Sequence, residues 1–271
     1  MPRNETVTLE GGCLVRELRA APILPTSPAG TLRVRRLFGR DTGAQAISLR
    51  ALEFSRGLSP AWRNVACDEV FFVLEGAGTV FLDGSGFEVC PDTGFYLRPG
   101  VDIAVDNPES GPLVLLSSTC PEPVEPPPLQ SAPPRPAAAA PQPTPTPVIR
   151  LSDREALPSG DRWYRVMVDA RLGCREVTQF VGAIPPGRAP DHYHQYEEVL
   201  YILQGSGVMW AGATCAPIAT GSCIFLSKGQ THCVENTGKV ELRLLGVFYP
   251  AGSPAVRYST DAGAPPRRPE P

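Results

Sequence analysis

The sequence predicts an all-β protein with two tandem domains, each a β-sandwich or β-barrel, on either side of a linker rich in proline and alanine. Two observations predict this class. Short apolar and β-branched runs recur along the chain with Gly, Pro, Asn or Asp between them, and no long helical periodicity competes with them. These runs stop between Pro121 and Pro147, where Pro, Ala, Gln and Thr dominate.

The clearest strands come in two groups. Three precede the linker and four follow it, at residues 70–74, 79–82, 113–117, 199–203, 208–210, 223–226 and 240–248. Turn-forming residues separate the members of each group at the spacing typical of a sandwich or barrel. Both domains are therefore expected to be built from strands alone.

The segment between the two groups lacks the apolar residues needed to bury a core, so it predicts an extended, semi-rigid spacer. We expect an N-terminal domain over residues 1–120, the linker over 121–148, a C-terminal domain over 149–261 and a disordered tail over 262–271. A domain of about 100 residues buries enough surface for a core of its own.

The two domains also repeat each other. Residues 68–78 align with residues 197–207, an offset of 129 positions, and the same offset carries Gly100 onto Gly229 and Asn107 onto Asn236. A single offset that holds over this distance indicates a duplicated fold with its strands and turns in one register.

All three histidines of the chain fall in two short segments of the C-terminal domain. His192 and His194 are two residues apart, so in a strand they would share a face, and Glu198 follows at the start of the next strand. His232 is expected from a strand across the barrel. A lone histidine is more often an ordinary half-buried residue, but this grouping of three imidazoles and one carboxylate favours a divalent transition-metal site.

These two segments resemble the two motifs of the cupin superfamily. The matching positions are Gly187, His192, His194, Glu198 and Gly205 in the first motif and Gly221, Gly229, His232 and Asn236 in the second. The first spacer is one residue short, and Ser227 stands at the proline position of the second motif. Because the chain is duplicated, it resembles a bicupin as a whole.

The resemblance implies two tandem jelly-roll β-barrels, with one metal ion inside the C-terminal one. Its ligands would be His192, His194, Glu198 and His232, and the ion would be Fe, Mn, Ni, Cu or Zn. In some cupin dioxygenases the ligand glutamate also accepts a proton, so the resemblance makes Glu198 the candidate catalytic residue. Glu197 and Cys233 are expected to point away from the metal because they alternate with ligands.

The N-terminal domain departs from this pattern. At the offset of 129, the histidine positions hold Arg63, Val65 and Ile103, and only Glu69 remains. One carboxylate cannot hold a transition metal, so we expect a metal-free barrel that serves stability, dimerisation or pocket closure. Arg63 is expected to form a buried ion pair with Glu69, with an anionic ligand of Arg63 as the alternative.

Aromatic residues near the ligands are candidates for the pocket wall. Tyr196 shares parity with His192 and His194 and is expected to face inward. Core packing is favoured over a pocket position for each of the further candidates, which are Phe180, Trp210, Phe225 and Tyr249. Three polar residues alternate with apolar neighbours and are expected on an outer face: Gln179, Glu241 and Arg243.

The resemblance favours a metal-dependent oxidoreductase of the dioxygenase type, acting on a small organic substrate as the flavonol or acireductone dioxygenases do. A non-redox metal enzyme is the first alternative: an isomerase, a cyclase or a hydrolase like the ureidoglycine aminohydrolases, which have a duplicated barrel with the metal on the C-terminal side. A small-molecule binding module is the second. Fold alone does not decide among them.

The composition excludes several other classes. Hydrophobic residues make up 42% of the chain and charged residues 20%, which is typical of soluble globular proteins. The net charge of −3 and the lack of a basic stripe argue against a nucleic-acid partner. No apolar run approaches the roughly 18 residues of a membrane span, and residues 1–5 lack a signal-peptide core. We therefore expect a cytoplasmic protein with eight free thiols, a small-molecule substrate and, from family habit, a homodimer.

Overall fold

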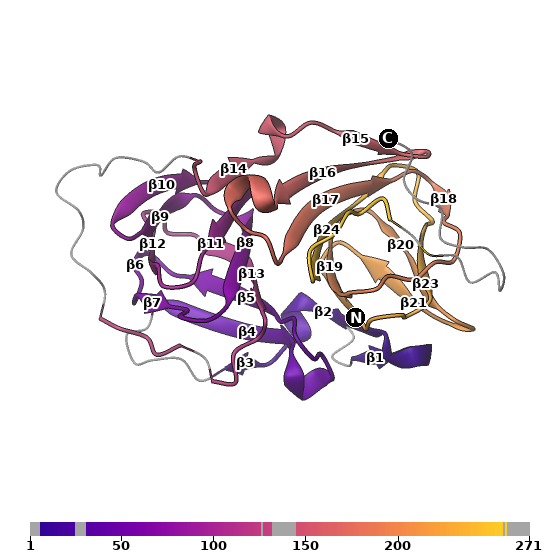
Figure 1. The fold of residues 1–271 in the computed structure, drawn as a ribbon, viewed down its shortest axis with the longest axis horizontal. Coiled ribbons are helices and arrows are strands. Elements are labelled where there is room, and N and C mark those ends of the chain that lie inside the picture. Colours follow the sequence, from indigo (N-terminus) through magenta and orange to yellow (C-terminus); the bar gives the residue numbers. More distant parts are fainter. Residues whose placement is uncertain (1–5, 25–30, 126, 132–144, 257, 259–271) are drawn as a thin grey trace. The chain divides into compact units, whose positions relative to one another are not determined.

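The computed structural model describes residues 6–24, 31–125, 127–131, 145–256 and 258, and they form an almost entirely β structure (Figure 1). The predicted all-β class is confirmed. The predicted tail and half of the predicted linker, residues 126 and 132–144, lie outside the described residues. In the part of the chain that is described, no helix is long and apolar enough to span a bilayer.

The chain forms two compact units. The N-terminal unit comprises Pro22–Arg154 and Met167–Val177, and the C-terminal unit comprises Met1–Ala21, Glu155–Val166 and Thr178–Pro271. The described residues also form five short 3-10 turns: η1 (Glu10–Gly12), η2 (Leu18–Ala20), η3 (Arg40–Thr42), η4 (Leu151–Asp153) and η5 (Ala170–Leu172).

Two antiparallel sheets build the N-terminal unit. The first has the order β14 (Val148–Arg150), β11 (Thr93–Leu97), β8 (Asp68–Glu75), β13 (Leu113–Cys120), β5 (Leu49–Phe54), β4 (Leu32–Phe38) and β3 (Ile23–Leu24). The second has the order β10 (Ser85–Val89), β9 (Gly78–Leu82), β12 (Asp102–Asn107) and β6 (Gly57–Leu58), with β7 (Trp62–Arg63) also paired to β12.

The C-terminal unit repeats this plan. Its larger sheet has the order β1 (Val7–Thr8), β2 (Leu14–Glu17), β22 (Ser222–Leu226), β19 (Glu197–Gln204), β24 (Leu242–Tyr249), β17 (Thr178–Ile184), β16 (Arg162–Val168) and β15 (Leu157–Ser159). Its smaller sheet has the order β18 (Gly187–Arg188), β23 (His232–Asn236), β20 (Ser206–Ala211) and β21 (Thr214–Ala219).

Each unit has its own apolar core between its two sheets. Phe71 and Phe95 stack at a centroid distance of 4.4 Å in the N-terminal core, and both are fully buried. Phe248 and Ile224 are fully buried in the C-terminal core. Burial of one such side chain contributes about 1.5–3 kcal/mol, so each core is large enough to hold its sheets together and to fix the strands that carry the site.

Short edge strands cross the predicted division of the chain. β2 pairs with β22, from Leu14 opposite Phe225 to Glu17 opposite Ser222, so the first residues of the chain join the C-terminal unit. β14 pairs with β11 of the N-terminal unit. These strands cover the exposed N–H and C=O groups of a sheet edge. The boundaries at residues 120 and 149 follow the internal repeat and stay a prediction, because contacts group these edge strands differently.

Candidate metal centre

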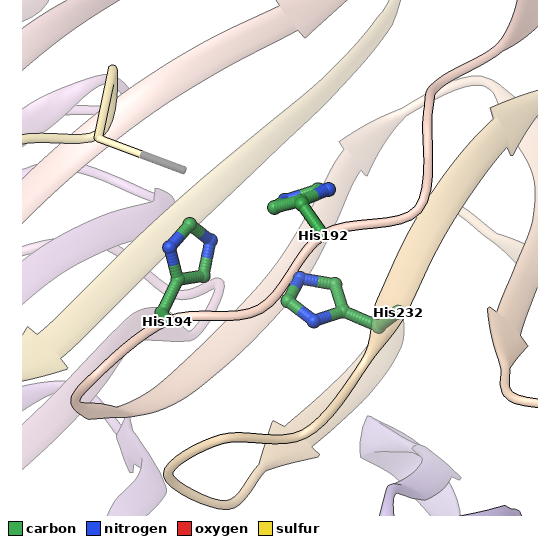
Figure 2. Close-up of side chains that lie close together, drawn as sticks. All are labelled: His192, His194 and His232. Carbon is green, nitrogen blue, oxygen red and sulfur yellow. The ribbon is translucent and has the colours of Figure 1, made fainter. Parts of the chain in front are cut away.

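His192 and His232 lie directly opposite each other. They form an antiparallel bridge in which His192 N–H donates to His232 O at 3.1 Å and His232 N–H donates to His192 O at 2.8 Å. Residues opposite each other in an antiparallel pair have neighbouring side chains on one face. His194, two residues on, joins them, and Figure 2 shows the three rings gathered together. One nitrogen of each ring lies within 4.8 Å of the others.

The glycine and asparagine positions of the two motifs explain why the strands meet there. Asn236 donates from Nδ2 to Ile184 O and Val240 O, both at 2.8 Å, and so ties β23 to β17 and to the turn before β24. Gly205 has φ +93°, and a methyl group on it would come within 3.1 Å of Leu242 Cα. Only glycine allows this turn and this close approach.

Glu198 lies beside this cluster of histidines and is the candidate for a fourth donor. It lies in β19, its side chain is buried, and its Oε2 is 3.9 Å from His194 Nε2. This separation is too long for a hydrogen bond but lets both atoms reach one ion through bonds of about 2.0–2.2 Å. Burial raises the pKa of Glu198 to about 8, because the carboxylate loses its hydration. A cation beside it would favour the charged form.

Backbone carbonyls set the tautomers of two histidines. His192 Nδ1 is 3.0 Å from Pro190 O, and His232 Nδ1 is 2.8 Å from Gln230 O. A carbonyl oxygen only accepts, so Nδ1 carries the proton in both rings and Nε2 presents its lone pair. This arrangement is the usual support of a metal-binding imidazole. The donor set therefore fits a divalent transition metal, with small ring rotations to bring the three nitrogens to one ion.

A cavity of about 90 Å³ opens beside these four side chains, and all four line it. Its apolar wall comes from Phe180, Leu200, Val234 and Leu244. Tyr196 also lines it, stacked between His194 at a centroid distance of 4.7 Å and Phe248 at 4.1 Å. Tyr196 thus faces inward as predicted, and its ring holds His194 flat against the core.

The β15–β16 hairpin adds a polar wall to the same cavity, through Ser159, Arg162 and Tyr164. Of the lining residues that the structure describes, Arg162 has the only permanently charged cationic side chain. The sequence does not reveal these residues as part of the site because the hairpin precedes the first motif and carries no pattern of its own.

Other predicted positions fall elsewhere. Phe180 lines the cavity although core packing was favoured for it, whereas Trp210, Phe225 and Tyr249 do not belong to the lining that the structure describes. Gln179 does not belong to the described cavity lining, and at 1% exposed it is nevertheless buried. Cys233 Sγ accepts a hydrogen bond from Arg188 Nε at 3.3 Å, on the side of β23 that also carries the stack of Arg188 on Trp210.

The strand pairings correct the comparison between the two barrels. Ile103 lies opposite Trp62, as His232 lies opposite His192, and Gly57 lies opposite Asn107, as Gly187 lies opposite Asn236. The counterparts of His192 and His194 are therefore Trp62 and Asn64, not Arg63 and Val65. The N-terminal barrel has one more residue between this segment and its glutamate, which a constant offset cannot reveal.

The predicted ion pair between Arg63 and Glu69 was wrong for the same reason. Arg63 is partly exposed and pairs with Asp102. Glu69 is fully buried, and its Oε1 lies 2.6 Å from Arg50 Nη2. Trp62 Nε1 donates to Glu69 Oε2 at 3.3 Å, and Asn64 and Ser117 also donate to this carboxylate.

Arg50 is thus the internal cation of the N-terminal barrel. It lies opposite Ser117 in β13, as Phe180 lies opposite Gly246 in β24. A guanidinium therefore replaces the aromatic ring that lines the cavity of the C-terminal barrel. The expectation of a metal-free N-terminal barrel agrees with these residue types, since only one of the four positions retains a metal-binding side chain.

Comparison with known proteins supports these features. The Cupin_2 model, "Cupin domain", matches residues 180–248. An oxalate-binding protein from Thermotoga maritima is 39% identical over 67 residues, which are 24% of this chain and 55% of the relative. Auxin-binding protein 1 from Arabidopsis thaliana is 31% identical over 86 residues, 28% of this chain and 43% of the relative. The match spans about half the length of these relatives.

Solved structures match the whole fold. Oxalate decarboxylase from Bacillus subtilis has a TM-score of 0.68 at 14% identity and covers 92% of this chain and 78% of its own. Protein Ylba from E. coli has a TM-score of 0.70 at 13% identity and covers 90% and 93%. At these identities the likeness establishes a shared two-barrel fold, which confirms the predicted architecture.

Proposed function

Since residues 180–248 match a cupin domain and the chain has the two-barrel fold, we propose that it is a metal-dependent oxidoreductase that takes a small carboxylate at its metal ion. The proposed ligands of one divalent ion are His192, His194, Glu198 and His232. One observation carries the proposal: a single small cavity is lined by these four donors and by the cationic side chain of Arg162.

The size of the cavity limits the substrate. A cavity of about 150 Å³ holds one benzene molecule, so about 90 Å³ admits a ligand of only a few heavy atoms. This size favours a short ligand over a flavonol. The names of the oxalate-binding protein and of oxalate decarboxylase point to the same size and charge class. We therefore propose oxalate or a similar short carboxylate as the substrate, in preference to an aromatic one.

The residues around the cavity suit a carboxylate. The planar guanidinium of Arg162 can bind two carboxylate oxygens at once. The apolar wall of the cavity excludes water and so strengthens the attraction between the guanidinium and the carboxylate. A bound divalent ion would supply a Lewis acid with open positions for substrate or O₂. Glu198 is the proposed proton acceptor, as the sequence analysis expected.

A second candidate, a binding protein without turnover, is favoured by the name of the oxalate-binding relative. Products separate the possibilities. Oxidation of oxalate consumes O₂ and two protons and yields two CO₂ and H₂O₂. Decarboxylation of hydrogen oxalate yields formate and CO₂ with no net use of O₂. A binding protein yields neither.

The metal content of the protein is the first test. Protein purified without nickel affinity resin should contain about one equivalent of a divalent transition metal by plasma mass spectrometry. His192→Ala/His194→Ala removes two donors and should abolish it, while Arg63→Ala, at an exposed residue of the other barrel, should leave it unchanged. A metal-free wild-type protein that also fails to take up added manganese would exclude the proposed centre.

The carboxylate site is tested by calorimetric titration of the metal-loaded protein with oxalate. A charge-assisted hydrogen bond contributes about 1.5–3 kcal/mol, so Arg162→Ala should weaken oxalate binding about tenfold to a hundredfold. Arg165→Ala is the matched control, because Arg165 lies on the same strand but outside the cavity lining. Equal affinities of the two variants would contradict the assignment of Arg162.

A further inference from the structure

The N-terminal turn η1 lies against the outside of the proposed metal centre. β2, which follows η1, pairs with β22, and residues 227–231, which we call the ligand loop, lead from β22 directly into His232. Glu10 anchors the turn: its N–H donates to Thr214 Oγ1 at 2.7 Å, and its carboxylate accepts from Ala213 N–H at 2.8 Å. Glu10 and Gly11 share a cavity with the ligand loop, so the two segments are neighbours.

The ligand loop holds two of the three histidines through backbone groups. Gly229 N–H donates to His194 O at 2.8 Å, and Gln230 O faces His232 Nδ1 at 2.8 Å. The Gln230 side chain is 8% exposed and donates from Nε2 to Thr231 O at 2.8 Å. This side chain therefore braces the peptide that connects Gln230 to His232.

Gly11 leaves the space that this side chain occupies. A methyl group on Gly11 would lie 2.1 Å from Gln230 Oε1 and 2.8 Å from both Cδ and Nε2. The next residue, Gly12, also has a left-handed backbone, with φ +90° against +73° for Gly11, but a methyl group there would meet nothing within 4 Å. The two glycines thus share a conformation and differ in their contact with Gln230.

We infer that Gly11 is a positioning residue for the metal ligand His232. By giving room to the Gln230 side chain, it keeps the ligand loop in the form that directs the Nδ1 proton of His232 to the backbone and Nε2 to the ion. This inference rests on the proposed metal centre, and it assigns to the N-terminal segment a part in metal binding that neither motif contains.

The test compares Gly11→Ala with Gly12→Ala in the full-length protein, with Co²⁺ as the probe and its Kd measured by competition with a chelator. Outer partners of a metal ligand change metal affinity about 10–100-fold, so Gly11→Ala should weaken Co²⁺ binding about tenfold. Gly12→Ala adds similar backbone strain without the collision and should bind as the wild type does. In Gly11→Ala/Gln230→Ala the affinity should equal that of Gln230→Ala alone.

Ring nitrogen NMR of the metal-free protein gives a second reading, and three histidines make the spectrum simple to assign. The His232 Nδ1 proton should be protected from exchange in the wild type and in Gly12→Ala, and lost to exchange in Gly11→Ala. If Gly11→Ala does not fold, Gln230→Ala alone should show the weaker Co²⁺ binding and the lost proton.

The outcomes separate the two proposals. A wild-type protein that binds Co²⁺, with equal affinities in Gly11→Ala and Gly12→Ala, would refute the role of Gly11 and leave the metal centre standing. A wild-type protein that binds no Co²⁺ would refute the metal centre, and this inference with it.

Discussion

At the scale of single residues, the proposed centre joins three imidazoles to a carboxylate that burial alone would protonate near neutral pH. A divalent ion binds the deprotonated carboxylate, so metal uptake should release a proton from Glu198. The backbone carbonyls of Pro190 and Gln230 prepare two of the rings for the same ion. The two histidine rings and the carboxylate are therefore preorganised to bind a cation.

Glu198→Gln separates the two roles of this side chain. A glutamine keeps one neutral oxygen donor, so we expect about one bound metal per chain at reduced affinity, but it cannot accept a proton. Proton transfer by a positioned group contributes about 10²–10⁴-fold, so turnover of oxalate by the metal-saturated variant should fall by at least that lower factor. Glu197→Gln is the control, because Glu197 does not belong to the described cavity lining. Loss of metal and turnover in equal measure would leave Glu198 a ligand only.

At the scale of the strands, the two barrels differ in the cation that compensates the charge of their buried glutamate. In the C-terminal barrel, β17 presents Phe180 to a cavity in which a metal ion is proposed. In the N-terminal barrel, the equivalent position on β5 presents Arg50, and its guanidinium pairs with the fully buried Glu69. Both barrels keep the buried carboxylate. In the N-terminal barrel Arg50 already supplies its counter-charge, whereas in the C-terminal barrel a metal ion is proposed to do so.

Removal of Arg50 should destabilise the N-terminal barrel strongly. Arg50→Met leaves Glu69 buried without its counter-charge, and breaking a buried pair in this way costs about 3–5 kcal/mol. Arg63→Ala breaks an exposed pair in the same barrel and should cost at most about 1 kcal/mol. Urea unfolding followed by intrinsic fluorescence measures both. Similar losses in the two variants would show that the Arg50–Glu69 pair contributes no more than a surface pair.

The strands also explain which site residues could be predicted from the sequence and which could not. The spacing of His192, His194 and Glu198 predicted a cluster because local periodicity fixes which side chains share a face. The counterparts Trp62 and Asn64 were missed because one additional residue before Glu69 shifts the register, and only the pairing of Trp62 with Ile103 reveals it. Arg50 and Arg162 reach their sites from strands without a motif, so their roles depend on tertiary structure.

At the scale of the whole molecule, the duplication predicted the architecture well, since both units repeat one plan of a larger and a smaller antiparallel sheet. The strands that join the opposite unit could not be predicted. β1, β2 and β14 have two to four residues each, too few for a periodic pattern, and their partners are chosen by which sheet edge they can cover.

The pairing of β2 with β22 has a consequence for biosynthesis. Glu17 accepts a hydrogen bond from Ser222, 205 residues later in the chain. At a synthesis rate of about 5–20 residues per second, β2 emerges from the ribosome roughly 10–40 seconds before its partner. The segment that carries Gly11 is therefore made well before the ligand loop that it contacts, and the two can dock only after β22 has been synthesised.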